Sequence, residues 1–243
     1  MLVSAPDLAF VGTRRPYKAS DMRGKFITFE GGEGTGKSTQ AAMLALRLES
    51  LGLAVQLTRE PGGSPGAEII RHVLLSGAAK PFGPEVEAML FAAARDDHVQ
   101  CTILPALEAG KWVICDRFAD STRVYQGVLG KVDERLIKGL ERVSIGSLAP
   151  DLTIILDVPV ELGLERIKQR RGAATPDRFE AENVEFHQKL REAFLAIAAE
   201  DPARCAVVDA SAAKEEVAKA VWDAVKSRLD PPAVRRVVED AVS

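Results

Sequence analysis

The sequence predicts a three-layer α/β domain built on a doubly wound, five-stranded parallel sheet. Five short runs are almost continuously apolar, which is typical of strands that are covered on both faces. Segments with the helical period of apolar residues separate these runs, and such strand–helix alternation is typical of a parallel sheet flanked by helices. The chain has 243 residues, of which 47% are hydrophobic, so it is long enough to bury a large core.

The expected strands are short apolar runs, each of which ends in a polar residue. In chain order they are Phe26–Glu30, Ala54–Thr58, Trp112–Asp116, Leu152–Asp157 and Ala206–Asp209. Ligands of parallel α/β sheets collect at the carboxyl ends of the strands. The sequence therefore predicts a site along the edge that carries Glu30, Thr58-Arg59-Glu60, Asp116-Arg117 and Asp157.

The expected helices are the segments in which apolar residues recur with the helical period. In chain order they are Lys37–Leu51, Ala67–Leu75, Pro84–Ala109, Asp133–Ile145, Val160–Arg170, Glu182–Glu200 and Lys214–Arg228. One domain accounts for all of these elements.

Charge and cysteine content narrow the class of protein. The formal net charge is -3, which argues against a nucleic-acid partner because such binding needs an excess of Lys and Arg. The three cysteines are scattered and form no CxxC motif, a pattern that favours a reducing, cytoplasmic location over a disulfide framework. No apolar run is long enough to span a membrane, so no membrane partner is expected.

The two ends of the chain differ from its centre. Residues 1–24 are rich in Pro, Ser and basic residues, and we expect a poorly ordered extension, with translation starting at Met22 as the alternative. The working domain is expected at 25–229. Residues 230–243, which contain Pro231 and Pro232, are expected to form a short appendage.

A phosphate-binding loop follows the first expected strand. Residues 31–38 read GGEGTGKS, which matches GxxxxGK[ST] between a strand and a helix. Backbone N–H groups of such a loop converge on phosphate oxygens, the lysine reaches the β- and γ-phosphates, and the serine hydroxyl binds Mg²⁺. The motif predicts an ATP site formed by Gly31, Gly32, Glu33, Gly34, Thr35, Gly36, Lys37, Ser38 and Thr39, with Mg²⁺ at Ser38.

The loop alone leaves the fate of the γ-phosphate open, and neighbouring motifs narrow it. The NKxD motif of switch GTPases and the LSGGQ signature of ABC-type ATPases are both missing. TREPGG at 58–63, DRF at 116–118 with Ser121, and YQG at 125–127 resemble the thymidylate kinase family of nucleoside monophosphate kinases. The resemblance runs from about Lys25 to Leu229 with the motifs in family order.

The resemblance implies an activity. It implies direct, in-line transfer of the γ-phosphoryl group from ATP to dTMP with Mg²⁺, giving dTDP for dTTP synthesis without a covalent intermediate. His72, His98 and His187 are then expected to be surface or packing residues rather than bases. The resemblance also implies a homodimer, for which the apolar residues Met89, Leu90 and Ile103 are candidate contacts.

Two residues one turn apart on a long expected helix are candidates for the base of the acceptor. Phe91 and Arg95 share one helix face, so a ring can stack on a base while a guanidinium donates to its carbonyl edge. In the family the matching residues do this with thymine. The alternative is that Phe91 is a core residue and Arg95 lies on a solvated face.

Further residues match the family's acceptor and catalytic sites. Planar guanidinium groups suit a phosphate, and the resemblance gives that role to Arg71 and Arg117, with Asp116 organising Mg²⁺ and phosphates. Ordinary surface, strand-end and helix-packing roles remain the alternatives. The residues implied to bind dTMP are Glu33, Glu60, Arg71, Phe91, Arg95, Arg117, Ser121, Tyr125 and Gln126.

A basic segment at about 166–180 is expected to be a lid. It contains Arg166, Lys168, Arg170, Arg171 and Arg178, which would otherwise be a solvated charge run. The phosphate loop has no Arg and so resembles the bacterial-type arrangement, in which the lid supplies the cation for the γ-phosphoryl group. Arg171 is the first candidate for this catalytic role and Arg170 the second.

Glu33 places a carboxylate inside a loop that binds phosphates. A side chain at this position can point out of the loop, and the family's loop acid accepts a hydrogen bond from the 3′-hydroxyl of dTMP. The alternative is a solvent-facing glutamate. Two other functions stay open, namely a kinase of another nucleoside or nucleoside monophosphate, and a nucleotide-binding protein without transfer chemistry.

Overall fold

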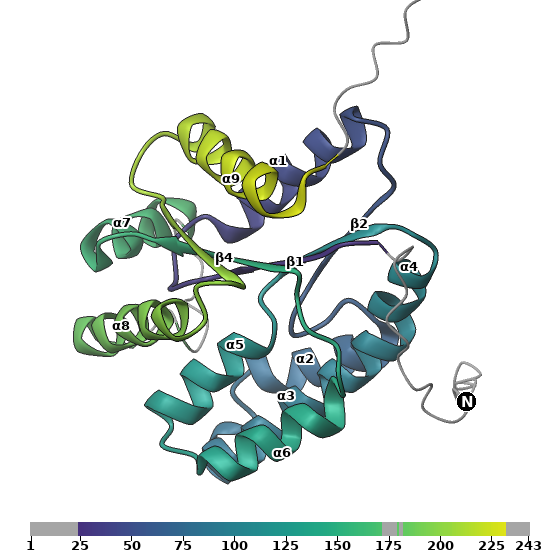
Figure 1. Cartoon of the computed structure of the whole chain (residues 1–243). Helices are drawn as coiled ribbons and strands as arrows, with labels where there is room; N and C mark the ends of the chain where they lie inside the picture. The colour runs from purple at the N-terminus through teal and green to yellow at the C-terminus, as the bar shows by residue number, and fades with distance from the viewer. Residues whose placement is uncertain (1–23, 172–178, 180–181, 232–243) are drawn as a thin grey trace, which may run out of the picture.

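A five-stranded parallel sheet forms the centre of the chain (Figure 1). The structure is a computed structural model that describes residues 24–171, 179 and 182–231. The strand order is β2-β3-β1-β4-β5, and each neighbouring pair is parallel. The predicted fold class, a doubly wound three-layer α/β domain, is confirmed.

The strands lie where the apolar runs predicted them. They are β1 (Phe26–Glu30), β2 (Val55–Arg59), β3 (Trp112–Asp116), β4 (Leu152–Asp157) and β5 (Cys205–Asp209). The register pairs Asp116 with Phe29 on one side and with Arg59 on the other. The carboxyl ends of β1, β2 and β3 are therefore level, and the polar residues that follow them meet at one edge.

The helices that flank the sheet are α1 (Lys37–Ser50), α2 (Pro65–Leu75), α3 (Pro84–His98), α4 (Leu104–Glu108), α5 (Ala119–Thr122), α6 (Glu134–Ser144), α7 (Val160–Arg171), α8 (Val184–Glu200) and α9 (Lys214–Leu229). A short 3₁₀ turn, η1 (Lys80–Phe82), precedes α3. Two π-helical turns, η2 (Val99–Ile103) and η3 (Arg123–Leu129), continue α3 and α5 respectively. Most bounds agree with the predicted helices to within two residues.

Two helical regions differ from the prediction. The helix expected over Pro84–Ala109 is interrupted by η2, which ends two residues before Pro105. Proline lacks an N–H and its ring collides with the carbonyl four residues earlier, so an α-helix does not pass through it undisturbed. The second difference is α5 with η3, which the sequence did not predict, because the apolar residues of this segment do not follow a clear helical period.

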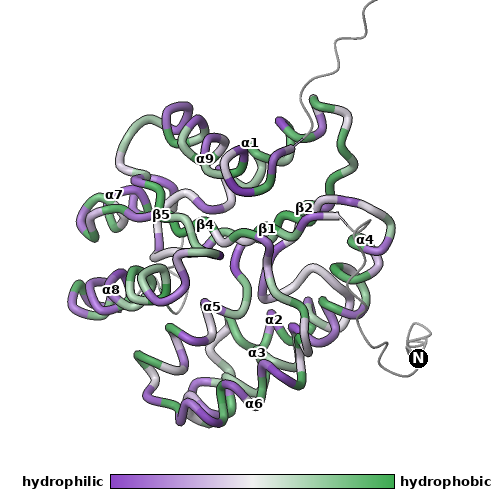
Figure 2. Tube along the Cα trace, in the orientation of Figure 1, coloured by the Kyte–Doolittle hydropathy of each residue, from purple (hydrophilic) through white to green (hydrophobic). Residues whose placement is uncertain are grey.

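Helices cover both faces of the sheet. On one face α1 and α9 pack on apolar side chains of the strands, among them Ile27, Phe29 and Ile154. On the other face η2 and α4 pack against β1 and β3, while α8 and η3 cover β4. Hydrophobic colour is accordingly concentrated along the strands in Figure 2, whereas the helices alternate between the two kinds of residue.

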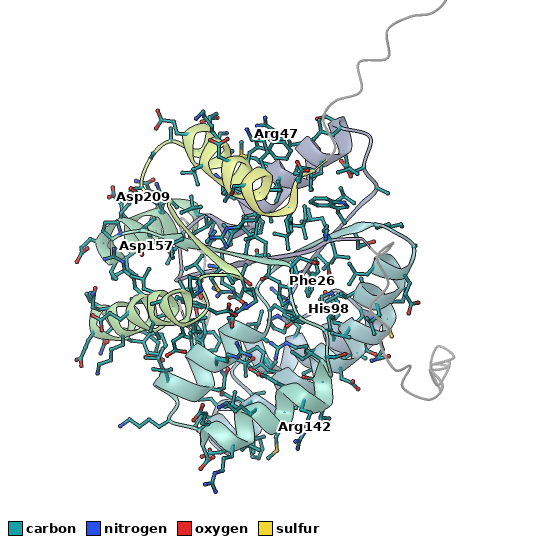
Figure 3. The ribbon with its side chains drawn as sticks, viewed as in Figure 1. Phe26, Arg47, His98, Arg142, Asp157 and Asp209 are labelled. Atoms are coloured by element: carbon teal, nitrogen blue, oxygen red, sulfur yellow. The ribbon has the colours of Figure 1, made fainter. Side chains whose placement is uncertain are left out.

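Side chains on the second face hold the turn that follows β3. Phe26 of β1 and Phe118 pack edge to face with their ring centroids 5.0 Å apart. Phe26 and His98 lie inside the molecule, whereas Arg47 and Arg142 lie at its outside (Figure 3). The buried Phe118 anchors the residues next to it, Arg117 in particular, at the edge of the sheet.

The expected terminal segments lie outside the described residues, apart from Gly24, Asp230 and Pro231. Within the ranges that the structure describes, the helices are too short or too polar to cross a membrane.

Candidate active site

The phosphate loop connects β1 to α1 through residues 31–36. Gly31 and Gly34 have φ angles of 129° and 73°, in the region that favours glycine. A Cβ atom would lie 2.4 Å from the Leu156 carbonyl oxygen at Gly31 and 2.1 Å from the Gly163 carbonyl oxygen at Gly34. The glycines of the motif thus allow the loop to pack directly on the backbone of β4 and α7.

Lys37 lies across the phosphate loop. Its Nζ donates hydrogen bonds to the carbonyl oxygens of Gly32 at 2.6 Å and Gly31 at 3.2 Å. Burial and the nearby charge of Arg117 lower the pKa of Lys37 to about 8. A bound phosphate would supply the negative charge that favours the ammonium form, so this lysine suits the motif's role.

Asp116 and Ser38 form a pair of oxygen ligands beside the loop. The Ser38 hydroxyl donates to Asp116 Oδ2, and the buried Oδ1 has no hydrogen-bond partner among the described residues. Hydroxyl and carboxylate oxygens suit Mg²⁺, which is usually held by one or two carboxylates together with water and substrate phosphates. The two residues therefore fit Mg²⁺.

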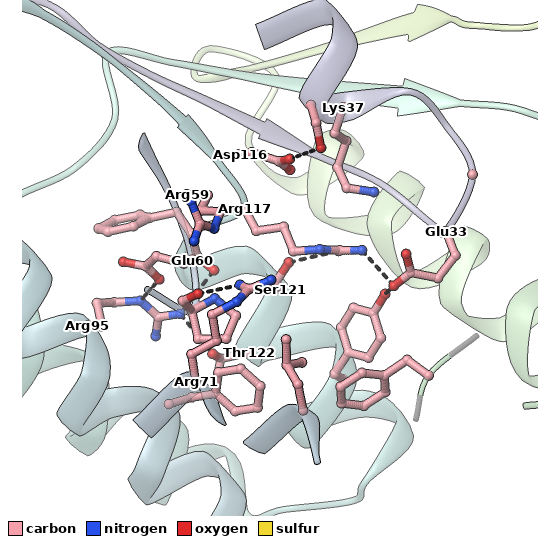
Figure 4. A pocket seen from close by; sticks show the side chains of 18 of the residues that line it. Glu33, Lys37, Arg59, Glu60, Arg71, Arg95, Asp116, Arg117, Ser121 and Thr122 are labelled. Atoms are coloured by element: carbon pink, nitrogen blue, oxygen red, sulfur yellow. Dashed lines mark hydrogen bonds and ion pairs between the residues drawn. The ribbon is translucent and has the colours of Figure 1, made fainter. Parts of the chain in front are cut away.

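Glu33 points out of the phosphate loop toward Arg117, which follows β3 (Figure 4), and it also contacts Tyr125 of η3. Its Oε1 accepts hydrogen bonds from Arg117 Nη2 at 2.6 Å and from the Tyr125 hydroxyl at 2.7 Å. Arg117 also donates from Nη1 to the Ser121 hydroxyl at 3.3 Å. The loop acid is thus part of a cluster with the DRF and YQG motifs, and the solvent-facing alternative for Glu33 is excluded.

The Glu33–Arg117 pair is ionised at neutral pH. Burial disfavours the charge on Glu33, but Arg117 and Lys37 outweigh it and lower the pKa of the carboxyl to about 2. Burial also opposes the charge of Arg117, whereas Glu33 and neighbouring acids raise its pKa above the ordinary arginine value. A fixed guanidinium beside the phosphate loop can bind and orient an anionic substrate.

A second buried pair lies on α3. Arg95 is 2% exposed, and its Nε donates to Glu60 Oε2 at 2.7 Å. Its Nη2 donates to the Phe118 carbonyl oxygen at 3.1 Å and to Thr122 Oγ1 at 3.0 Å. The solvated-face alternative for Arg95 is therefore wrong, because its guanidinium is inside the molecule.

The other oxygen of Glu60 contacts a buried histidine. His98 Nδ1 lies 3.1 Å from Glu60 Oε1, and His98 Nε2 lies 2.7 Å from Thr58 Oγ1. His98 has no exposed surface. His98 therefore positions the Glu60 carboxylate, which in turn contacts Arg95. This contact between the TREPGG motif and α3 was not predicted.

A cavity of about 420 Å³ connects the phosphate loop with these buried pairs. Most of the predicted site residues line it, namely Glu33, Gly34, Gly36, Lys37, Ser38, Thr39, Glu60, Arg71, Phe91, Arg95, Asp116, Arg117, Ser121, Tyr125, Gln126 and Arg170. Gly31, Gly32 and Thr35 border a second, smaller cavity on the other side of the loop. The structure thus brings residues from six separate stretches of sequence around one space.

The cavity has further lining residues to which the sequence assigned no binding role, namely Arg59, Pro61, Leu75, Phe118, Thr122 and Phe179. Four of them belong to the quoted motif segments or lie beside them, so the motifs carried a signal. Leu75 is one turn after Arg71 on the same helix face. Phe179 packs edge to face on Tyr125 with ring centroids 4.9 Å apart, and no local pattern indicates this contact.

Arg71 reaches the cavity from α2. Its Nη1 donates to the carbonyl oxygen of Pro61 at 2.5 Å, and the side chain lines the cavity. This position agrees with a role at the acceptor phosphate, which stays a prediction.

The predicted lid begins within α7. Arg166 donates to the carbonyl oxygens of Ala210 at 2.8 Å and Ser211 at 3.1 Å, so it ties α7 to the loop after β5. Arg170 lines the cavity. The side chain of Arg171 and the whole of Arg178 lie outside the described residues, and the choice between Arg171 and Arg170 stays a prediction.

Comparison with known proteins agrees with this geometry. A family model described as thymidylate kinase matches residues 29–221. The chain belongs to the thymidylate kinase family. A thymidylate kinase of Bradyrhizobium sp. strain BTAi1 is 64% identical over 207 residues, which cover 85% of this chain and 92% of the relative. The corresponding protein of Nitrobacter winogradskyi strain Nb-255 is 63% identical over 211 residues, covering 87% and 92% respectively.

Proposed function

We propose that this chain transfers the γ-phosphoryl group of ATP to the phosphate of dTMP, giving ADP and dTDP, in the pathway to dTTP. The observation that carries the proposal is the shared cavity, which is lined both by Lys37 of the phosphate loop and by Phe91 and Arg95 of α3. Family membership and the close relatives agree with this reaction.

The acceptor phosphate is proposed to lie between the phosphate loop and α5. Arg117 would hold it there, since a planar guanidinium matches phosphate geometry, and Arg71 would approach from α2. An acceptor oxygen then attacks the γ-phosphorus in line while the bond to the β,γ-bridging oxygen breaks and ADP leaves. The acceptor oxygen is already ionised near neutral pH, so no general base is needed.

The base is proposed to bind between Phe91 and the buried end of the cavity. The described hydrogen bonds of Arg95 are made by Nε and Nη2, which leaves Nη1 as the donor for a base carbonyl. Phe91 is half-buried and lines the same cavity, so its ring can stack on the base. Gln126 and Tyr125 would complete the pocket beside the sugar.

At the donor end Lys37 would contact the β- and γ-phosphates, and Arg170 or Arg171 would supply a further cation. Catalysis of phosphoryl transfer rests on positioning and on cations at the γ-phosphoryl oxygens. Ser38 and Asp116 would hold Mg²⁺, which when bound neutralises charge on the transferring phosphates. The residues of the chain therefore orient both substrates.

Coupled assays with a series of acceptors test the function. We expect rapid ADP formation with dTMP and much slower formation with thymidine or dCMP, because the cavity offers separate contacts for phosphate, sugar and base. Faster phosphorylation of thymidine than of dTMP would contradict the proposal, as would ATP turnover that does not respond to dTMP.

Glu33→Ala is expected to weaken dTMP binding much more than ATP binding. Both hydrogen bonds to Glu33 from described residues are made to Oε1, so Oε2 is the oxygen available to the 3′-hydroxyl of dTMP. Loss of a hydrogen bond to a charged group costs about 1.5–3 kcal/mol, or roughly 10- to 100-fold in Kd. Calorimetric titration of each nucleotide measures the difference.

A 3′-deoxy analogue of dTMP is the matched control for this substitution. It lacks the hydroxyl, so the difference in affinity between parent and Glu33→Ala is expected to be smaller for it than for dTMP, and the difference that remains measures the loss of the Glu33–Arg117 contact. A selective loss of ATP affinity in Glu33→Ala would show that the carboxylate serves the donor site instead.

We also propose that the protein is a homodimer that uses the side formed by α2 and α3. Ile69 of α2 and Met89 of α3 are 63% and 47% exposed. Ile103, a candidate contact from the sequence, is wrong for this role because it is completely buried in the core. Sedimentation velocity tests the proposal, and a monomer at micromolar concentration would contradict it.

A cytoplasmic location is proposed as well. All three cysteines are free thiols, which agrees with a reducing compartment. Recovery of the protein in another cell fraction would contradict this location.

A further inference from the structure

Glu30 is a buried carboxylate directly before the phosphate loop. It ends β1, has no exposed surface and does not line the cavity. Its Oε1 accepts hydrogen bonds from the backbone N–H groups of Phe118 at 2.7 Å and Ser121 at 3.2 Å. Its Oε2 accepts from the Ser121 hydroxyl at 2.7 Å. The side chain of Glu30 therefore accepts three hydrogen bonds, one from Phe118 of the DRF motif and two from Ser121.

These bonds hold the backbone that directly follows Arg117. Arg117 has a φ angle of 70°, a left-handed conformation that is unfavourable for a residue with a Cβ atom. The Arg117 N–H donates to the Phe29 carbonyl oxygen at 2.9 Å, and the next N–H, that of Phe118, donates to Glu30. The last two residues of β1 thus stabilise the turn at which Arg117 leaves the sheet.

Glu30 also determines how the Ser121 hydroxyl is oriented. Because this hydroxyl donates its proton to Glu30, its lone pairs are available to Arg117 Nη1, 3.3 Å away. The other terminal nitrogen of Arg117 donates to Glu33 at 2.6 Å. The guanidinium is therefore held from two sides, by Glu33 directly and by Glu30 through Ser121.

The charge of Glu30 is costly where it lies. Burial, followed by the nearby Asp120, raises its pKa to about 7, although Ser121, Arg117 and the Phe118 N–H favour the ionised form. The charge of Glu30 also opposes burial, which lowers the pKa of Lys37 on α1, and it adds to burial in raising the pKa values of the Cys115 and Cys205 thiols. Since the folded-state pKa lies above the ordinary value of 4.5, the stability contributed by protonated Glu30 is lost as pH rises through about 7.

We propose that Glu30 is a positioning residue that fixes the Arg117 turn and orients the Ser121 hydroxyl, so that the acceptor arginine is in place before dTMP binds. The proposal rests on the proposed function, in which Arg117 holds the acceptor phosphate. It gives a role to a carboxylate at a buried position where burial disfavours its charge.

Glu30→Gln is the direct test. The amide keeps the size and one acceptor oxygen, but it places an NH₂ donor where Ser121 needs an acceptor. We expect kcat/KM for dTMP to fall by about tenfold or more while KM for ATP changes less than about twofold. The Tm at about pH 8 is expected to equal or exceed that of the parent, because a buried charge has been removed.

A kcat/KM for dTMP within about threefold of the parent would overturn the proposal. So would a lower Tm accompanied by equal losses for both substrates, since that result describes a residue needed only for folding. Failure of the parent protein to phosphorylate dTMP would overturn the proposed function instead, so the two failures are distinguishable.

Two further variants complete the experiment. Thr28 lies on β1 two residues before Glu30, and Thr28→Val removes its buried hydrogen bond to Thr153 Oγ1 of β4. This control is expected to lower Tm without changing KM for dTMP. Glu30 and Ser121 act through one chain of hydrogen bonds, so Glu30→Gln/Ser121→Ala is expected to be little worse than Glu30→Gln alone. Fully additive losses would overturn the link through Ser121.

Discussion

Arg117→Ala is expected to lower kcat/KM for dTMP by roughly 10³-fold or more, because cations on the transferring phosphates supply much of the catalysis in this class of reaction. The guanidinium contacts Glu33 of the phosphate loop and Ser121 of α5. Its removal is therefore expected to abolish the contact to the acceptor phosphate and the hydrogen-bonded link between the phosphate loop and α5. Steady-state kinetics with each nucleotide varied in turn measure the effect, and KM for ATP is expected to change far less.

Two control substitutions separate geometry from charge. Arg117→Lys keeps the charge but cannot make both directional bonds, so we expect it to recover only a small part of the lost activity. Arg47→Ala removes the same charge from α1, where Arg47 stacks on Trp222 with its guanidinium 4.3 Å from the ring centroid. Its kinetic constants are expected to match the parent, and an Arg117→Ala enzyme with parental kcat/KM would contradict the assignment.

The pKa of Glu33 should rise in Arg117→Ala. Arg117 is the largest of the charges that keep the pKa of this buried carboxyl near 2, and burial alone would raise it. Protonation of Glu33 would then begin at a higher pH and would add to the loss of dTMP affinity in mildly acidic buffer.

Arg95→Met is expected to destabilise the fold by about 3–5 kcal/mol, because it leaves Glu60 as a buried carboxylate without its cation. The side chains of this pair are 2% and 4% exposed, so solvent screens it little. For a domain of this size the loss corresponds to a fall in Tm of roughly 10 °C. Affinity for dTMP is expected to fall as well, because Nη1 no longer reaches the base.

The variant Arg95→Met/Glu60→Gln separates the two effects. Removal of both charges of a buried pair restores most of the stability, so its Tm is expected to approach the parental value. Its affinity for dTMP is expected to stay low. Parental dTMP affinity in this stable double variant would show that Arg95 does not read the base, whatever the single variant does.

Local sequence was sufficient to predict the strands, most of the helices and the phosphate loop. The spacing of glycines, Lys37 and Ser38 is contiguous, and a strand before it and a helix after it follow from apolar patterns within about 20 residues. The strand ends also indicated the edge of the sheet at which Asp116 and Glu60 lie. The helices that differ from the prediction are α5 and the α3–α4 region. Their course depends on packing against the sheet and, for α3–α4, on Pro105.

Motif resemblance found most of the cavity but did not show which side chains pair. The bonds from Glu33 to Arg117 and from Arg95 to Glu60 join residues 84 and 35 positions apart. Taken singly, each residue has an ordinary local explanation: Glu33 as a loop acid, Arg95 as a helix-surface arginine and Glu60 as a strand-end acid. Only their burial at one place distinguishes them from such residues.

By itself the sequence determined the parallel α/β sheet, the phosphate loop and the set of candidate residues, because these depend on patterns that are read along the chain. The tertiary structure decided that Glu33 contacts Arg117 and Tyr125 and that Arg95 is buried. It also decided that Glu30 holds the turn of Arg117. The physical reason is the sheet register, which makes the ends of β1, β2 and β3 level and so places distant carboxylates and guanidinium groups within hydrogen-bonding distance.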